Sequence, residues 1–226
     1  MQYLKRIARK FQKLLETKVL SNLLSKTIWR YRHIYKPSWA NISINSQQFK
    51  HRYKFVDTIA SFQETKKILE IGCAAGPNLR LLRENLPKTE LTGIDINKKC
   101  VDIGNKYFQS KSDYNCKLFN KSTDQLSFFK DKSFDVVCSQ AVFIFLPPDK
   151  IEKAIFDITR LSRKGLVLHE YYKKEANKGY FDEGCWVYDY PAILNKFLDN
   201  PKIQISSSSF KGGSWDTFGR IIKVSF

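Results

Sequence analysis

The feature that most constrains the fold is a regular alternation of short apolar segments and helical patterns between residues 67 and 170. Strands that pair in parallel need crossover connections of a dozen or more residues, usually helices, and this alternation supplies them. It therefore predicts a largely parallel sheet covered by helices. The predicted strands are 67–71, 90–95, 115–119, 134–139 and 165–170, and the predicted helices are 78–86, 97–108 and 147–161.

The C-terminal part does not continue this alternation of strands and helices. Residues 171–189 are irregular and rich in aromatic side chains, and a helix is predicted at 192–198. Strands are predicted at 202–206 and 218–226, joined by a loop that contains two glycines and no helical pattern. The predicted fold class is therefore α/β, a Rossmann-like, seven-stranded, mostly parallel sheet with an antiparallel last strand, behind an N-terminal helical extension.

The formal charge of +17 is concentrated at the N-terminus. Residues 1–54 hold thirteen Lys and Arg against the single acid Glu16. From Tyr3 to Arg32 the chain has no Gly or Pro and its apolar residues recur at helical spacing, and a second helix is predicted at 47–62. We therefore predict a basic helical extension at 1–46 and an α/β domain at 47–226.

Three interpretations of the extension stay open. Its apolar stripe packs on the α/β domain, or residues 1–36 lie on an anionic membrane surface. The third, less favoured, is contact with RNA phosphates, because no recognised RNA-binding motif is present. In the packing interpretation the extension covers the ligand pocket, with Trp39 and Tyr53 as candidate covering residues.

The cysteines argue against a metal site and against a disulfide framework. All five are scattered, with no C-x-x-C pair and no histidine at metal-ligand spacing. No apolar run approaches the roughly 20 residues of a membrane span, and the N-terminus lacks the pattern of a secretory signal. We expect a cytoplasmic protein without a metal, with the inner membrane surface as the place of any peripheral contact.

The residues most informative about function follow the first predicted strand. Glu70 ends that strand, and a turn with Gly72 and Gly76 leads into a helix. Glycine lets the backbone approach a ligand closely, and the helix directs its free N–H groups toward the turn. Asp95 ends the second strand, where a carboxylate can accept hydrogen bonds from both hydroxyls of a ribose. The pattern predicts a nucleotide-type cofactor.

Two common nucleotide-binding patterns do not fit. The nicotinamide fingerprint G-x-G-x-x-G would need glycines at 72, 74 and 77, where the chain has Gly72, Ala74 and Pro77. The phosphate-loop signature that ends in Gly-Lys-Ser/Thr is absent from the sequence.

The segment 68–170 instead resembles class I S-adenosylmethionine-dependent methyltransferases. Ile68–Leu79 is similar to motif I, Leu91–Ile96 to motif II, and Leu126–Val137 to the passage that leads into the fourth strand. Ala74 replaces the usual middle glycine, and Ser122 stands where relatives carry an acid. The resemblance implies S-adenosylmethionine as cofactor. The residues it assigns to that cofactor are Glu70, Gly72, Cys73, Ala74, Gly76, Asn78, Asp95, Ile96, Ser122, Thr123 and Gln140.

A methyltransferase with a hydroxyl acceptor also needs a base. His169 and Glu170 are candidates because they end the fifth strand, and strand alternation places their side chains on opposite faces. His169 is favoured because its ordinary pKa suits proton transfer near neutrality, although a structural histidine is an equal alternative. Candidate substrate-binding aromatics lie further along the chain, and they equally suit a core role: Tyr171, Tyr180, Trp186 and Trp215.

The sequence thus predicts methyl transfer to a small-molecule or glycan acceptor. The aromatic pattern after the fifth strand resembles bacterial methyltransferases associated with surface-polysaccharide biosynthesis, which favours a sugar acceptor. Two alternatives remain: an RNA methyltransferase, and an inactive protein of the same fold that acts as an interaction module. Ala74 and Ser122 are the departures that keep the inactive alternative open.

Overall fold

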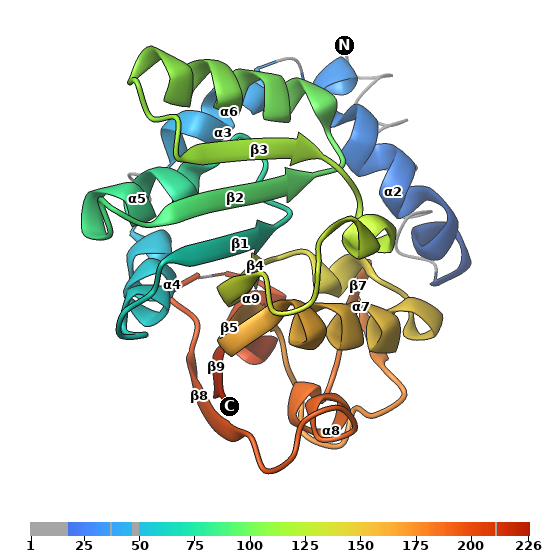
Figure 1. Cartoon of the computed structure of the whole chain (residues 1–226). Helices are drawn as coiled ribbons and strands as arrows, with labels where there is room; N and C mark the ends of the chain where they lie inside the picture. Colours follow the sequence, from blue (N-terminus) through green and yellow to red (C-terminus); the bar gives the residue numbers. More distant parts are fainter. Residues whose placement is uncertain (1–17, 37, 47–49, 211) are drawn as a thin grey trace.

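The computed structural model describes residues 18–36, 38–46, 50–210 and 212–226. Its centre is a seven-stranded sheet in the order β3-β2-β1-β4-β5-β9-β8 (Figure 1). The first five strands of that order pair in parallel, and β9 is antiparallel to both β5 and β8. The predicted fold class is confirmed. The strands are β1 Lys67–Ile71, β2 Glu90–Asp95, β3 Cys116–Asn120, β4 Phe134–Gln140, β5 Ser162–Tyr171, β8 Lys202–Ser207 and β9 Gly219–Ser225.

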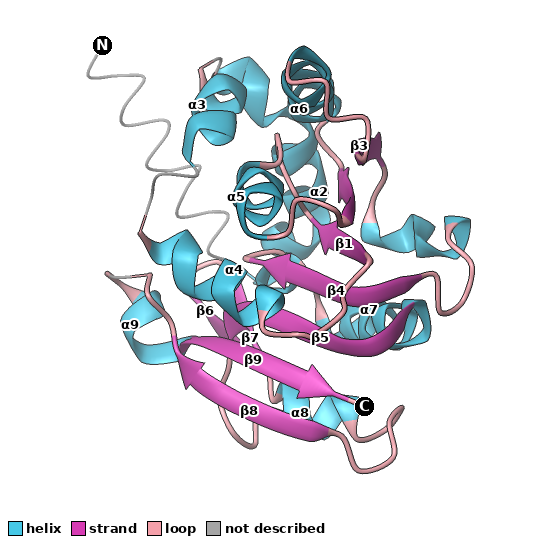
Figure 2. Ribbon diagram, turned by 60° about the vertical axis from the view of Figure 1, so that its left-hand side comes forward, coloured by secondary structure: helices cyan, strands magenta, loops and turns pink. Residues whose placement is uncertain are grey.

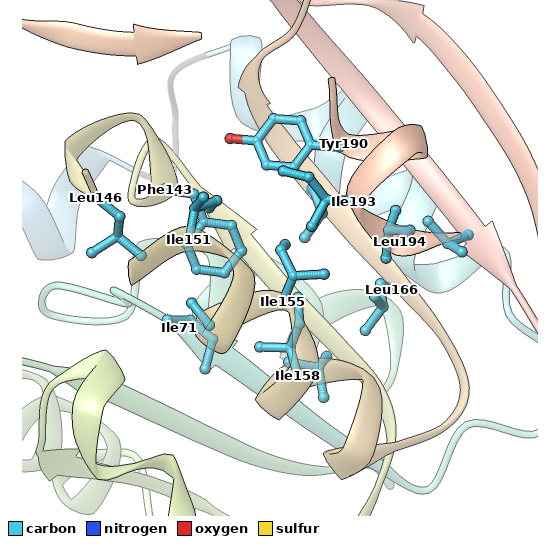
Figure 3. Packing of buried hydrophobic residues seen from close by; sticks show 14 of the residues in the cluster. Ile71, Phe143, Leu146, Ile151, Ile155, Ile158, Leu166, Tyr190, Ile193 and Leu194 are labelled. Atoms are coloured by element: carbon cyan, nitrogen blue, oxygen red, sulfur yellow. The ribbon is translucent and has the colours of Figure 1, made fainter. Parts of the chain in front are cut away.

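Helices cover both faces of the sheet, which gives three layers (Figure 2). Successive strand residues point to opposite faces, so Ile68 packs under α4, α5 and α6, whereas Leu69 packs under α7 and α8. Figure 3 shows the second of these cores, where apolar side chains of α7 and α8 meet the sheet. The helices are α4 His51–Ala60, α5 Pro77–Asn85, α6 Lys98–Ser110, α7 Pro148–Leu161 and α8 Tyr190–Leu194.

Two further helices belong to the predicted extension; the first lies at the carboxyl ends of β2 and β3 (Figure 1), and both contribute residues to a cavity described below. They are α2 Lys18–Tyr35, which is kinked at Tyr31, and α3 Trp39–Asn45. α2 contacts α3 and the 3-10 turn η3 Phe143–Phe145, and α3 packs on α6. The first part of the predicted extension, residues 1–17, lies outside the described residues. None of the described helices is long and apolar enough to cross a membrane.

The segment expected to be irregular contains a two-stranded hairpin. β6 Tyr180–Asp182 pairs antiparallel with β7 Cys185–Val187, and the ring of Phe181 packs on that of Trp186. The predicted helix at 192–198 instead begins at Tyr190 and ends at Leu194. A short helix, α9 Ser214–Phe218, also interrupts the expected loop before β9. Aromatic packing, which has no simple sequence period, stabilises the hairpin.

Candidate cofactor and acceptor site

A cavity of about 450 Å³ opens at the carboxyl ends of β1, β2 and β4, the position where open α/β sheets bind ligands. Its volume is within the usual range of small-molecule sites. Helices α2, α3 and α4 supply the wall that faces the sheet. Every residue assigned to the cofactor from sequence lines this cavity except Gly76, which caps the N-terminus of α5 in a left-handed conformation.

The turn after β1 has the tight geometry that the motif implies. Gly72 has φ of +70°, and a Cβ at this position would overlap the side chain of Val142. Ala74 has φ of +50°, so a residue with a side chain occupies the left-handed region where relatives carry glycine. Its N–H donates to Asp95 Oδ2 at 2.8 Å. That bond stabilises the turn and offsets part of the cost of the Ala74 conformation.

Asp95 lines the cavity, and both of its carboxylate oxygens accept hydrogen bonds from backbone N–H groups. Its Oδ1 accepts from the backbone N–H of Asn97 at 2.7 Å, while Oδ2 accepts from Ala74. Burial raises the pKa of this carboxyl to about 6, and the two backbone donors oppose that rise. Each carboxylate oxygen has a second lone pair, so Asp95 can also accept hydrogen bonds from ribose hydroxyls.

Glu70 presents a buried oxygen that the protein itself does not satisfy. Oε1 accepts from Asn78 Nδ2 at 2.7 Å, whereas Oε2 has no hydrogen-bond partner among the described residues. Burial raises the pKa of this carboxyl to about 7, and Asn78 and Arg52 act in the opposite direction. Buried polar atoms are nearly always paired, so an orphaned carboxylate oxygen in a cavity marks a place for a donor or a cation. The α-ammonium of S-adenosylmethionine has this chemistry.

Arg52 supplies a positive group next to Glu70. Its Nη1 donates to Asn78 Oδ1 at 2.9 Å and to Gln140 Oε1 at 2.8 Å, and Nε donates to the Ser46 carbonyl at 3.0 Å. Asn78 therefore connects the cation to Glu70. A carboxylate and a guanidinium on one side of the cavity match the ammonium and carboxylate of an amino acid. The sequence analysis did not identify Arg52, because one arginine among many basic residues gives no signal.

The adenine end of the predicted site is bounded by Ile96, Ser122 and Thr123. Ser122 forms a capping box with Gln125 at the start of the 3-10 turn η2 Thr123–Phe128. Its backbone N–H donates to Gln125 Oε1 at 3.0 Å. The segment is thereby fixed without the acid that relatives carry at this position.

Helix α2 forms a roof over this end of the cavity. The Trp29 ring packs against Phe145 and Trp39, with centroid distances of 4.9 and 6.0 Å. Asn97 Nδ2 donates to the Trp29 carbonyl at 3.0 Å, and Lys26 forms an ion pair with Asp124. Trp39 lines the cavity as its candidate covering role requires, whereas Tyr53 is 45% exposed and does not line it.

His169 and Glu170 do point to opposite faces, but neither lines the cavity. His169 is fully buried, with Nδ1 bonded to Gln140 Nε2 at 2.8 Å and Nε2 bonded to Ser208 Oγ at 2.6 Å. Glu170 accepts from the Ser139 hydroxyl and from the backbone N–H groups of Val142, Phe143 and Ile144. It holds the loop after β4 in place. The geometry gives neither residue access to an acceptor.

The four aromatics predicted to bind substrate also lie outside the cavity wall. Trp186 is 1% exposed in the core beneath α7, Tyr171 packs on Trp215, and Tyr180 lies near Phe218. From the C-terminal part of the chain, the aromatic ring that lines the cavity is Phe210, with Trp215 stacked behind it at 4.9 Å. Strand alternation alone could not show which aromatic of this region faces the ligand.

Cys73 lines the cavity as a small, neutral side chain. Burial raises the pKa of its thiol well above the ordinary value, so the thiol stays protonated. It packs closely on Gly93, where a Cβ would lie 2.5 Å from the sulfur. Among the described residues, no group of three His, Cys, Asp or Glu side chains could hold a metal ion.

Comparison with known proteins shows similarity over the region that contains β1 to β5. Residues 68–165 match a family model described as a methyltransferase domain. The carboxy-S-adenosyl-L-methionine synthase of Campylobacter lari is 27% identical over 185 residues, which covers 69% of this chain and 76% of the synthase. An uncharacterised protein of Rickettsia prowazekii is 31% identical over 98 residues, and the match spans only 39% of that protein.

The fold comparison adds a solved enzyme with its cofactor. The crystal structure of magnesium protoporphyrin IX methyltransferase from Synechocystis PCC 6803 with bound S-adenosylmethionine is similar, with a TM-score of 0.65 and 15% identity over 91% of this chain and 96% of that one. Residues 68–165 are thus similar to a methyltransferase domain, and most of the chain shares its fold with a solved S-adenosylmethionine-dependent methyltransferase.

Proposed function

We propose that this protein transfers the methyl group of S-adenosylmethionine to a small-molecule acceptor. The observation that carries the proposal is the orphaned Oε2 of Glu70, buried in a cavity beside the cation of Arg52. The two groups match the zwitterionic end of the cofactor. The cofactor supplies an activated methyl group, so the protein's task is to orient the acceptor and to exclude water.

Each part of the cavity has a role in this proposal. Glu70 would hold the ammonium of the cofactor, Arg52 its carboxylate and Asp95 its ribose. Ile96 would pack on the adenine, and the roof formed by Trp29 would keep water out. The cavity continues past these residues to His51 and Phe210, which leaves a wall for the acceptor.

Calorimetry with S-adenosylmethionine and S-adenosylhomocysteine tests the proposal. Asp95→Ala is expected to weaken both ligands about tenfold or more, since hydrogen bonds to a charged group contribute about 1.5–3 kcal/mol. Asp102→Ala is the matched control, because Asp102 forms an exposed ion pair with Lys98. If neither ligand binds, the result would contradict the proposal and favour an inactive interaction module.

A second candidate follows from the Campylobacter lari relative, whose name describes synthesis of carboxy-S-adenosylmethionine. The observation that favours it is the buried cation of Arg52, which could hold an additional carboxylate beside Gln140. Mass spectrometry of the nucleoside released by denaturing the purified protein separates the two candidates. The carboxylated form would support the synthase, and S-adenosylmethionine or S-adenosylhomocysteine would support methyl transfer.

The acceptor class and the role of the extension are proposals that separate experiments address. A glycan acceptor rests on the resemblance of the aromatic segment alone, since Tyr180 and Trp186 lie outside the cavity.

Packing of α2 and α3 over the cavity supports the interpretation that the extension packs on the α/β domain. Flotation with anionic and neutral vesicles, and RNA binding at two salt concentrations, test the membrane and RNA interpretations. In each assay the full chain is compared with a variant that lacks residues 1–17.

A further inference from the structure

The cavity contains an imidazole that the cofactor assignment leaves without a role. His51 begins α4 and lines the cavity, next in sequence to Arg52. Its ring stacks on Phe210 with a centroid distance of 3.8 Å and an interplanar angle of 30°. Phe210 in turn stacks on Trp215 at 4.9 Å and 21°. The three rings form a column whose two cavity-facing members come from distant parts of the chain.

Hydrogen bonds hold this column against α4. Ser209 Oγ donates to the His51 carbonyl at 2.8 Å, and the Phe210 N–H donates to Ser208 Oγ at 2.9 Å. Ser208 also bonds His169, which orients Gln140. The loop after β8 is therefore bonded to His51 directly and, through His169, to Gln140 at the end of β4. A catalytic side chain needs this kind of support, because a small misplacement lowers the rate strongly.

We propose that His51 is the catalytic base, and that its imidazole accepts the proton of an aromatic alcohol bound in the aromatic part of the cavity. This inference rests on the proposed methyl transfer and specifies its acceptor. The acceptor side of the cavity wall carries the ring of Phe210, which stacks on Trp215 behind it. A planar acceptor can stack in such a site, and its hydroxyl needs a proton acceptor within reach.

The protonation state of His51 agrees with this role. Burial lowers its pKa to about 4, and the positive charge of Arg52 acts in the same direction. The other titratable groups around it are Glu70, which lines the same cavity from β1, and His169 on β5, whose own pKa is lowered to about 3. His51 is therefore neutral at physiological pH, and the same lowered pKa makes it a weaker base than an exposed histidine.

The transfer balances without a further reactant. The acceptor oxygen forms a bond to the methyl carbon, the carbon–sulfur bond breaks with its electron pair going to sulfur, and the hydroxyl proton passes to an imidazole nitrogen of His51. The sulfonium charge is lost in the same step, so the resulting imidazolium faces less positive charge than it would before transfer. The proton then leaves to solvent.

The first test is NMR of the protein labelled with ¹³C at histidine Cε1. Its three histidines are His33, His51 and His169, and the His51 signal is identified by its loss in His51→Gln. The probe is 2-naphthol, added to the complex with S-adenosylhomocysteine. We expect a saturable shift of the His51 signal and at least tenfold weaker binding in Phe210→Ala. Tyr53→Phe is the control on the same helix, because Tyr53 is exposed and outside the cavity.

The second test measures formation of 2-methoxynaphthalene from 2-naphthol and S-adenosylmethionine. His51→Gln is expected to react at least about 100-fold more slowly, the usual size of a general-base effect, with cofactor affinity within twofold of the wild type. No binding of 2-naphthol, binding without a shift at His51, equal rates in both proteins, or no product from the wild type would each overturn the inference. Failure of S-adenosylhomocysteine to bind would instead contradict the proposed function.

Discussion

Replacing Glu70 with glutamine is expected to make the protein more stable and, at the same time, a weaker binder of its cofactor. Glu70 is 2% exposed, and burial raises the pKa of its carboxyl from 4.5 to about 7. The folded protein therefore holds this proton more tightly than the unfolded chain does. Since a tenfold change in acidity corresponds to about 1.4 kcal/mol, ionised Glu70 costs the folded state about 3 kcal/mol.

The pH dependence follows from the sign of this shift. Above pH 7 the carboxylate is ionised in both states and the full cost is present, whereas below pH 4.5 it is protonated in both and the cost disappears. Glutamine is neutral throughout and keeps an oxygen for Asn78. Glu70→Gln should therefore raise the free energy of unfolding by up to about 3 kcal/mol at pH 8.5 and by almost nothing at pH 4.5. Urea unfolding followed by tryptophan fluorescence measures both values.

Cofactor binding should change in the opposite direction. Without the carboxylate the α-ammonium loses its charged partner, so S-adenosylmethionine should bind at least about tenfold more weakly at pH 8.5. Methylthioadenosine, which lacks the amino-acid end, should bind both proteins equally. Glu90→Gln is the matched control, because Glu90 is half exposed and paired with Lys67 at the surface. A Glu70→Gln protein that is no more stable than the wild type at pH 8.5, or equally stabilised at both pH values, would refute the reasoning.

Three other outcomes follow from the cavity. Gly72→Ala forces a side chain into the left-handed region and against Val142, so it should lower the free energy of unfolding by about 2–4 kcal/mol, measured in urea. Arg52→Met should weaken S-adenosylmethionine about tenfold or more in calorimetry and leave methylthioadenosine unchanged, because only the former carries a carboxylate. Affinity for methylthioadenosine, which lacks the amino-acid end that Glu70 would hold, should fall below pH 6, since the Asp95 pKa of about 6 means that acid protonates the acceptor of the ribose hydroxyls, and a pH-independent affinity would contradict that role.

The sheet could be predicted from sequence because its determinants are local. Each βα unit has its own apolar run and its own turn in consecutive residues, and β1 and β2 have the predicted bounds. The positions of the turn at Gly72 and of the carboxylate of Asp95 also follow from where β1 and β2 end. Residues that act where a parallel strand ends can therefore be placed from the strand pattern alone.

The other half of the cavity could not be predicted, because it depends on packing between distant segments. His51 and Phe210 are separated by most of the α/β domain, and the stacking of their rings and the Ser209–His51 hydrogen bond bring them together. The strand pattern places His169 at the correct strand end, yet bonds to Gln140 and Ser208 occupy both ring nitrogens. Alternation distinguishes two faces of a sheet, but it does not reveal whether a given face holds a ligand or a helix.

The roof over the cofactor end has a consequence for turnover. α2 is held to the domain by contacts such as the Lys26–Asp124 ion pair, which is partly exposed, and the bond between Asn97 and the Trp29 carbonyl. Such contacts contribute little individually, whereas the layers beneath are fixed by fully buried apolar side chains. We therefore expect α2 to open at a lower free-energy cost than unfolding of the whole domain. Spent nucleoside would leave by this route, and the rate of that opening would limit how often the protein can act.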